Sequence, residues 1–259
     1  MKQNCPCQKI GRDFLFKGII SRMETLALNA QKLFGVTLSV AQLKQLSTYE
    51  SLLLEWNEKI NLTAIRDVPG IRSKHFLDSL SCVLAFKGGE APRSLIDVGT
   101  GAGFPGIVLK ILYPSMKLTL VESVGKKAKF CADVVEKLGL ANVQILSARA
   151  EDVGRMKDQR EKYDWAVARA VAQMPVLAEY LLPLVKVGGC VLAQKGETGP
   201  AEVNQSAQAF KILGGRFRQV VNVQLPGVAD ERFLVIIDKI ALTPTTVPRQ
   251  AGTPTKKPL

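Results

Sequence analysis

From Glu24 to about Phe86 the chain has the apolar periodicity of helices. Five apolar side chains recur at intervals of three or four residues and would share one helix face: Leu43, Leu46, Tyr49, Leu53 and Trp56. Ser39 is a residue type that caps the start of such a helix. A second helix is predicted from about Val68 to Ala85, and the run 87–92, with two glycines and a proline, is typical of a linker.

After Arg93 the pattern changes to short apolar runs that alternate with helical ones. Strands are predicted at 94–98, 118–122, 143–146, 164–168 and 190–194. Helices are predicted to begin near Phe104, Gly125 and Glu151, and a fourth to run over 174–187. Alternation of this kind predicts a parallel sheet with helices on both faces.

The end of the chain departs from a purely parallel arrangement. Two β-rich runs, 217–224 and 232–240, are joined by Leu225-Pro226-Gly227 without a full helix, which predicts an antiparallel pair. This order of elements resembles a class I (Rossmann-like) methyltransferase, with a seven-stranded, mostly parallel sheet and an antiparallel last strand. We therefore expect a loosely structured extension (1–23), an N-terminal helical segment (24–92), a methyltransferase domain (93–241) and a basic C-terminal tail (242–259).

The net charge of the chain indicates the kind of partner that it binds. The 259 residues include 35 Lys and Arg against 23 Asp and Glu, a formal net charge of +12. A strongly basic protein attracts polyanions, of which nucleic acid is the commonest. The alternative is a charged surface that only keeps the protein in solution.

Other features concern location and metal binding. No run approaches the roughly 20 apolar residues that span a bilayer, and the N-terminus lacks the apolar run of a secretory signal. Cys5 and Cys7 have no second pair and give no zinc pattern. We expect a cytoplasmic protein with reduced thiols, no membrane contact and no metal, and nothing demands more than a monomer.

The strongest single motif is the glycine-rich run 94–106, where a buried strand enters a loop and then a helix. Gly99, Gly101 and Gly103 allow a tight turn and the close approach of a ligand. Glu122 ends the next strand, where a carboxylate can accept from ribose hydroxyls. The run also fits the dinucleotide pattern G-x-G-x-x-G, but Asp97 suits a sulfonium and an amino-acid end better than a pyrophosphate.

Further candidates follow the later strands. Around Ala150 and Glu151, backbone N–H groups or a carboxylate could contact an adenine edge, although acids also favour a helix start. Arg169 ends the fourth strand and Lys195 the fifth, at the edge where such sheets bind ligands. Asp78 and Ser79 are candidates to fix a loop near the cofactor.

Several separated motifs resemble the RsmG family, also called glucose-inhibited division protein B. The resemblance covers about residues 26–259. Its motifs are DVGTGAGFPG at 97–106, VES at 121–123, RAE at 149–151, ARA at 168–170, WNEKINLTA at 56–64, HFLDSL at 75–80 and the tail 248–259.

The resemblance implies a cofactor, S-adenosylmethionine, and a partner, the 16S ribosomal RNA of the small ribosomal subunit. The reaction implied is methylation of a guanine N7, at guanine-527 in the rRNA numbering. The implied cofactor residues are Gly99, Phe104, Ala150, Glu151 and Arg169, with Glu122 near the ribose.

N7 carries a lone pair and no proton, so no catalytic general base is predicted. His75, the sole histidine, is expected to be structural or to face RNA. Lys195, Arg249, Lys256 and Lys257 are predicted RNA contacts, although the tail could also be merely disordered.

Three alternatives share part of these features. A small-molecule methyltransferase would use the same cofactor loop but leaves the charge of +12 unexplained. An NAD-dependent oxidoreductase would need a proton-relay pair that the sequence does not offer. A non-catalytic RNA-binding chaperone would have no use for an intact glycine loop.

Overall fold

The computed structural model describes residues 23–86 and 90–259. The predicted N-terminal extension with Cys5 and Cys7 lies outside the described residues, as does part of the predicted linker. Within the described part, no helix is long and apolar enough to cross a membrane.

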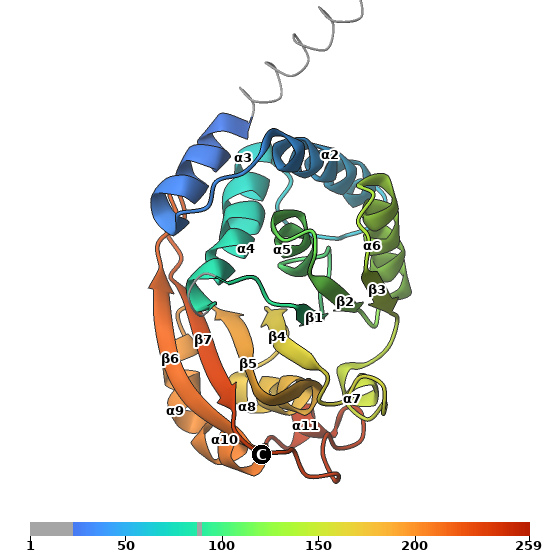
Figure 1. Cartoon of the computed structure of the whole chain (residues 1–259), viewed down its shortest axis with the longest axis vertical. Coiled ribbons are helices and arrows are strands. Elements are labelled where there is room, and N and C mark those ends of the chain that lie inside the picture. Colours follow the sequence, from blue (N-terminus) through green and yellow to red (C-terminus); the bar gives the residue numbers. More distant parts are fainter. Residues whose placement is uncertain (1–22, 87–89) are drawn as a thin grey trace, which may run out of the picture.

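A seven-stranded sheet organises the chain (Figure 1). Its order is β3-β2-β1-β4-β5-β7-β6, with β7 antiparallel to both neighbours and β1 to β5 parallel. This is the predicted class I methyltransferase architecture. The strands are β1 (Ser94–Val98), β2 (Lys117–Val121), β3 (Val143–Leu146), β4 (Tyr163–Arg169), β5 (Val185–Lys195), β6 (Gly215–Val223) and β7 (Arg232–Lys239).

Helices flank the sheet on both faces. Residues 23–34 are helical, and the predicted second helix is present with a π-helical turn, Arg72–Leu77, between α3 and α4. The 3₁₀ turns Ser81–Ala85 and Leu182–Leu184 extend α4 and α8. The helices are α2 (Val40–Asn57), α3 (Val68–Ile71), α4 (Asp78–Leu80), α5 (Gly106–Leu112), α6 (Gly125–Lys137), α7 (Ala150–Val153), α8 (Met174–Leu181), α9 (Gly199–Gln205), α10 (Ala207–Ile212) and α11 (Thr253–Lys256).

Several boundaries differ from the prediction by one or two residues, and the junction between α8 and β5 differs by more. The helix predicted over 174–187 ends earlier, because Pro183 falls in its last turn and β5 begins at Val185. The early start of β5 was not visible in the sequence, because Gly188 and Gly189 are residues that rarely lie inside a strand. A Cβ at Gly189 would come within 2.6 Å of the Asp164 carbonyl oxygen, so the close approach of β4 and β5 explains the glycine. Helices α9, α10 and α11 were not predicted.

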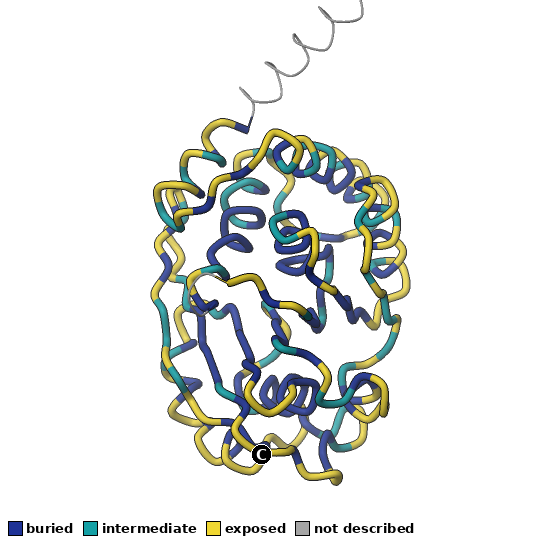
Figure 2. Tube along the Cα trace, in the orientation of Figure 1, coloured by how far each residue is buried: buried dark blue, intermediate teal, exposed yellow. Residues whose placement is uncertain are grey.

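Successive residues of each strand belong to opposite apolar cores. Leu95 packs in the core under α2, α5 and α6, whereas Ile96 packs in the core over α8 and α10. The inner strands and the inner helix faces are largely buried, whereas the edge strands β3 and β6 are partly exposed (Figure 2). The N-terminal helices therefore share a core with the sheet.

Residues 242–259 pack against the second face of the sheet domain. Val247 and Pro254 are buried, and Arg160 donates to the carbonyl oxygens of Thr243 (2.7 Å) and Val247 (2.8 Å). The segment lies beside α7 and α8 in Figure 1. This basic segment is thus an ordered part of the fold.

Candidate functional site

The glycine loop joins β1 to α5 at the carboxyl edge of the sheet. Gly99, Gly101 and Gly103 all have positive φ, at 68°, 60° and 90°, so the predicted tight turn is confirmed. A Cβ at Gly99 would meet Val171 at 2.6 Å, and a Cβ at Gly103 would meet the Tyr49 hydroxyl oxygen at 2.6 Å. Side chains therefore enclose the loop so closely that it needs glycine at both positions.

A buried carboxylate supports this loop from below. Asp97 is fully buried, and its Oδ2 accepts from the Thr100 hydroxyl (2.6 Å) and the Gly106 N–H (2.9 Å). Its Oδ1 has no hydrogen-bond partner among the described residues. Burial raises the pKa of Asp97 to about 6, against the opposing effect of these hydrogen bonds. A cation bound above the loop would be stabilised by this carboxylate.

Glu122 directly follows β2 and holds the loop from the side. Its Oε2 accepts from the Gly101 N–H (2.9 Å), and its Oε1 accepts from the Val124 N–H (2.8 Å). Each carboxylate oxygen has a further lone pair for a ligand hydroxyl. The acid predicted to lie near the ribose is thus fixed beside the glycine loop.

A cavity of about 430 Å³ opens at this edge, and we call it the loop cavity. It is bounded by the loop, the ends of β2 and β3, the segment after β4, α8 and the C-terminal segment. Three of the predicted cofactor residues line it: Gly99, Ala150 and Glu151. The Glu151 carboxylate accepts from the Gly252 N–H (2.8 Å), so it anchors the C-terminal segment, and Thr255 and Pro258 of that segment form part of the wall.

A second cavity of about 400 Å³, the arginine cavity, lies at the ends of β4 and β5. Its lining residues come from the N-terminal helices and from the strand ends: Ile65, Lys74, His75, Asp78, Arg169, Ala170, Gln194, Lys195, Gly196, Thr198 and Arg232. The segment 170–172 separates it from the loop cavity, because Ala170 lines one and Val171 and Ala172 line the other. Two cavities therefore adjoin along the active edge of the sheet.

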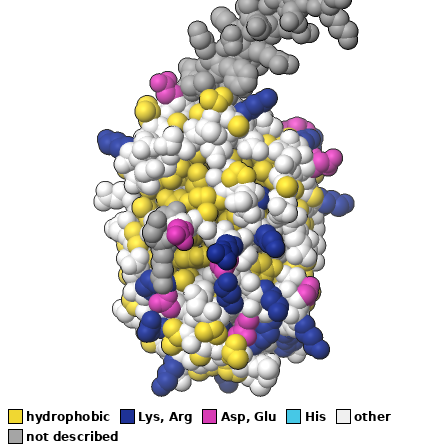
Figure 3. Space-filling view, in the orientation of Figure 1, with side chains coloured by type: hydrophobic (Ala, Val, Ile, Leu, Met, Phe, Trp, Pro, Cys, Tyr) yellow, Lys and Arg dark blue, Asp and Glu magenta, His cyan; other side chains and the backbone are white. Residues whose placement is uncertain are grey.

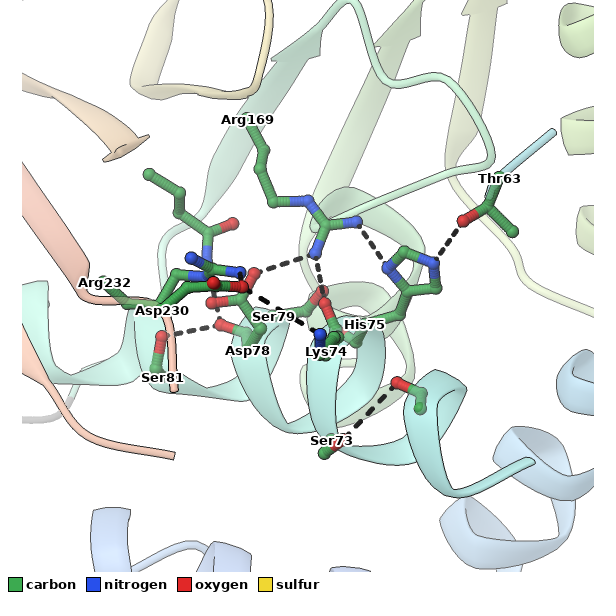
Figure 4. Close-up of polar contacts among 12 residues, drawn as sticks. Thr63, Ser73, Lys74, His75, Asp78, Ser79, Ser81, Arg169, Asp230 and Arg232 are labelled. Carbon is green, nitrogen blue, oxygen red and sulfur yellow. Dashed lines mark hydrogen bonds and ion pairs between the residues drawn. The ribbon is translucent and has the colours of Figure 1, made fainter. Parts of the chain in front are cut away.

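Arg169 joins the two parts of the chain inside the arginine cavity (Figure 4). Its guanidinium donates to Asp78 (2.8 Å), to the Lys74 carbonyl oxygen (3.1 Å) and to His75 Nδ1 (3.2 Å). It also lies over the Phe104 ring, 5.0 Å from the centroid. Arg169, predicted as a site residue because it ends a strand, thus binds the helical segment 72–80. The sequence had connected that segment with the site only through Asp78 and Ser79.

His75 is a neutral, fixed side chain. Burial and the neighbouring Arg169 lower its pKa to about 3. Arginine can only donate, so Nδ1 accepts and the ring proton is on Nε2, which donates to Thr63 Oγ1 (2.8 Å). The ring also stacks on Phe104, with centroids 4.6 Å apart. His75 is therefore positioned to shape the cavity rather than to take up a proton.

Phe104 is the centre of an aromatic cluster beneath the site. Besides His75 it stacks with Tyr49 of α2, at 5.2 Å between centroids, and the Tyr49 hydroxyl donates to the Ala102 carbonyl oxygen. Tyr49 and Phe104 are both buried. The N-terminal helical segment thus supports the glycine loop from the face opposite to α8.

The predicted RNA-binding cations fall into two groups. Lys195 Nζ pairs with Glu202 (2.6 Å) and donates to the Ala172 carbonyl oxygen (2.9 Å), and Arg249 Nη2 pairs with the fully buried Glu179 (2.6 Å). Lys195 and Arg249 therefore form ion pairs with buried carboxylates of the same chain, and the sequence pattern did not indicate these pairs. Lys256 and Lys257 are exposed on α11 and beyond. Figure 3 shows further Lys and Arg side chains gathered over the same lower part of the molecule.

Sequence comparison identifies close relatives. The model of the family described as rRNA small subunit methyltransferase G matches residues 42–232. A ribosomal RNA small subunit methyltransferase G from Pelotomaculum thermopropionicum is 49% identical over 236 residues, which cover 91% of this chain and 98% of that protein. One from Roseiflexus sp. is 48% identical over 234 residues, covering 90% and 99%.

Solved structures are similar in fold only. A geranyl diphosphate methyltransferase in complex with S-adenosylmethionine gives a TM-score of 0.50 at 11% identity, over 64% of this chain and 85% of that chain. The [4+2]-cyclase SpnF gives 0.50 at 14% identity, over 64% and 82%. Because a cyclase and a methyltransferase share this fold, function has to be argued from the site.

Proposed function

The chain belongs to the family of rRNA small subunit methyltransferase G, and from this premise we propose that it methylates N7 of one guanine in 16S ribosomal RNA. S-adenosylmethionine is the cofactor and supplies the methyl group as an electrophile on sulfur. The target proposed from the family is guanine-527 of the rRNA, in the small ribosomal subunit, which makes the cytoplasm the place of action.

One observation carries the proposal: two cavities adjoin along the active edge of the sheet, separated only by the segment 170–172. The loop cavity is proposed to take the cofactor and the arginine cavity the guanine. Alignment of donor and acceptor across that segment would supply much of the rate enhancement, since well-oriented reactants gain up to about 7–11 kcal/mol.

The residues present fit the cofactor. The carboxylate of Asp97, with its unpartnered Oδ1, suits a ligand that carries positive charge. Glu122 has acceptor capacity left for ribose hydroxyls, and Ala150 lines the loop cavity. Gly99 would line the floor, with Gly101, Gly103 and Phe104 supporting the loop behind it, and Arg169 would form the boundary with the guanine.

The chain does not need a general base for this reaction, because N7 offers a lone pair and carries no proton. His75 supports that assignment, since it is neutral and its Nε2 proton is directed to Thr63. His75 and Arg169 instead form part of the wall of the arginine cavity. Lys256, Lys257 and the overall charge of +12 favour an RNA partner over a small molecule.

The proposal is tested by incubating the protein with radiolabelled S-adenosylmethionine and one of two substrates. One is small ribosomal subunits from cells lacking this protein, and the other is free guanine nucleotides. Label is expected in the subunit RNA and not in the nucleotides. Label in the nucleotides alone would replace the RNA substrate by a small molecule.

A further inference from the structure

We propose that Gln194 selects guanine by accepting a hydrogen bond from the exocyclic amino group on C2 of the base. The inference rests on the proposed function, because it assigns the guanine to the arginine cavity. Gln194 is the penultimate residue of β5, in register with Arg169 of β4, and lines that cavity.

The side-chain amide of Gln194 has a fixed orientation. Its Nε2 donates to the Asp78 carbonyl oxygen at 2.8 Å, and the residue is only 5% exposed. A carbonyl oxygen can only accept, so exchanging the amide N and O would bring two acceptors together. Oε1 is therefore the free end of the amide.

This Oε1 is buried and has no hydrogen-bond partner among the described residues. Buried acceptors in folded proteins are nearly always satisfied, so an exception calls for a donor from elsewhere. The other such atom, Asp97 Oδ1, belongs to the carboxylate that binds Thr100 and Gly106 at the glycine loop. Gln194, which lines the arginine cavity, thus carries a buried acceptor that no described residue uses.

The strand order sets the direction of the base. Along the sheet edge the sequence is β1, β4, β5, so the loop cavity at β1 lies on one side of Arg169 and Gln194 lies on the other. The reacting N7 has to face the loop cavity. The amino group on C2 is at the opposite end of the fused ring system, and it would face β5 and Gln194.

An acceptor at this position discriminates among purines. Guanine presents an amino group on C2, whereas adenine has only C–H there and inosine has lost the amino group while keeping N1–H and O6. A base without this donor would leave Oε1 buried and unsatisfied in the complex, and sites of this kind reject analogues that lack the donor.

The test compares guanosine with inosine at the target position of small subunits assembled in vitro around synthetic 16S RNA. With wild-type protein, kcat/KM is expected to be about 10- to 100-fold lower for inosine, the range given by one lost buried hydrogen bond. Equal rates on the two would overturn the inference and leave the proposed function intact. Absence of N7 methylation on both would overturn the proposed function and the inference with it.

Two variants test whether the preference for guanosine over inosine depends on Gln194. In Gln194→Met the preference for guanosine over inosine should disappear, and in Gln219→Met, a matched change of an exposed glutamine on β6, it should stay at the wild-type ratio. A Gln194→Met protein that keeps the wild-type ratio would overturn the assignment to Gln194. The ratio is internal to each variant, so altered stability alone would not move it.

Discussion

Arg169 at the end of β4 donates to the carboxylate of Asp78 at 2.8 Å, across 91 residues of sequence. Both side chains are largely buried, at 17% and 4% exposure. The pair therefore fixes the N-terminal helices to the carboxyl edge of the sheet, in the wall of the arginine cavity.

Removing Asp78 should leave Arg169 without its carboxylate inside the protein. We expect Asp78→Ala to lower the free energy of unfolding by about 3 kcal/mol, because breaking a buried pair strands the remaining charge. Chemical denaturation measures this. Lys59→Ala, which breaks the exposed pair with Glu55, should change it by less than about 1 kcal/mol. Equal effects in both variants would contradict the role given to Asp78.

Cofactor affinity should depend on the ionisation of Asp97. Burial raises its pKa to about 6, and a bound cation favours the ionised form, so affinity should fall as pH drops below 6. At pH 5 about one tenth of the carboxylate is ionised, which predicts binding weaker by up to about tenfold than at pH 7.5. Calorimetric titration with S-adenosylmethionine measures it, and Asp97→Asn should abolish the pH dependence. A pH-independent wild-type affinity would contradict this account.

His75 predicts a different pH effect, on stability. Its pKa falls from an ordinary value of 6.5 to about 3 in the folded protein, so its contribution is complete above pH 6.5 and is lost as pH falls towards 3. Relative to His75→Gln, the wild-type protein should lose about 2 kcal/mol of unfolding free energy between pH 8 and pH 5. Denaturation curves at the two pH values measure the difference. A constant difference would show that His75 titrates normally.

The two groups of C-terminal cations should respond differently to substitution. Arg249→Met leaves the fully buried Glu179 without its partner and should lower stability by about 3 kcal/mol. It should also weaken cofactor binding, because Thr255 and Pro258 of the same segment line the loop cavity. Thermal unfolding with and without S-adenosylmethionine checks both effects. An unchanged melting temperature would contradict the anchoring role of Arg249.

Lys256 and Lys257 are exposed, so the double variant Lys256→Ala/Lys257→Ala should leave stability and cofactor binding unchanged. If both contact phosphates, the slope of log affinity against log salt for subunit RNA should decrease in magnitude by about 1–2. Filter binding at several salt concentrations measures the slope. An unchanged slope would remove these two lysines from the RNA interface.

The local pattern was sufficient for most of the fold. Strands β1 and β3 begin and end where the apolar runs predict, and the antiparallel end of the sheet followed from the short connection between β6 and β7. Helix α7 is a single turn, Ala150–Val153, and it ends at Gly154, where Pro248 of the C-terminal segment packs so closely that a Cβ would meet it at 2.8 Å. Contacts of this kind join distant segments and leave no periodic signal in the sequence.

The same limit applies to the site. The glycine loop and the strand-end positions of Arg169 and Lys195 were visible in the sequence, because motif and strand register are local. The partners were not: Glu202 neutralises Lys195 and Glu179 neutralises Arg249 through tertiary packing. Gln194 was missed, although a polar residue that ends a run of buried apolar ones in β5 was an available indication.

The identity of the methylated nucleoside tests the central claim most directly. Small subunits from cells lacking this protein would be treated with the protein and S-adenosylmethionine, and their RNA analysed by nucleoside chromatography and by borohydride–aniline cleavage, which breaks RNA at 7-methylguanosine. The account predicts 7-methylguanosine and one new cleavage site, at guanine-527 of the 16S RNA. A different methylated nucleoside, or no methylation of RNA by protein that binds the cofactor, would contradict it.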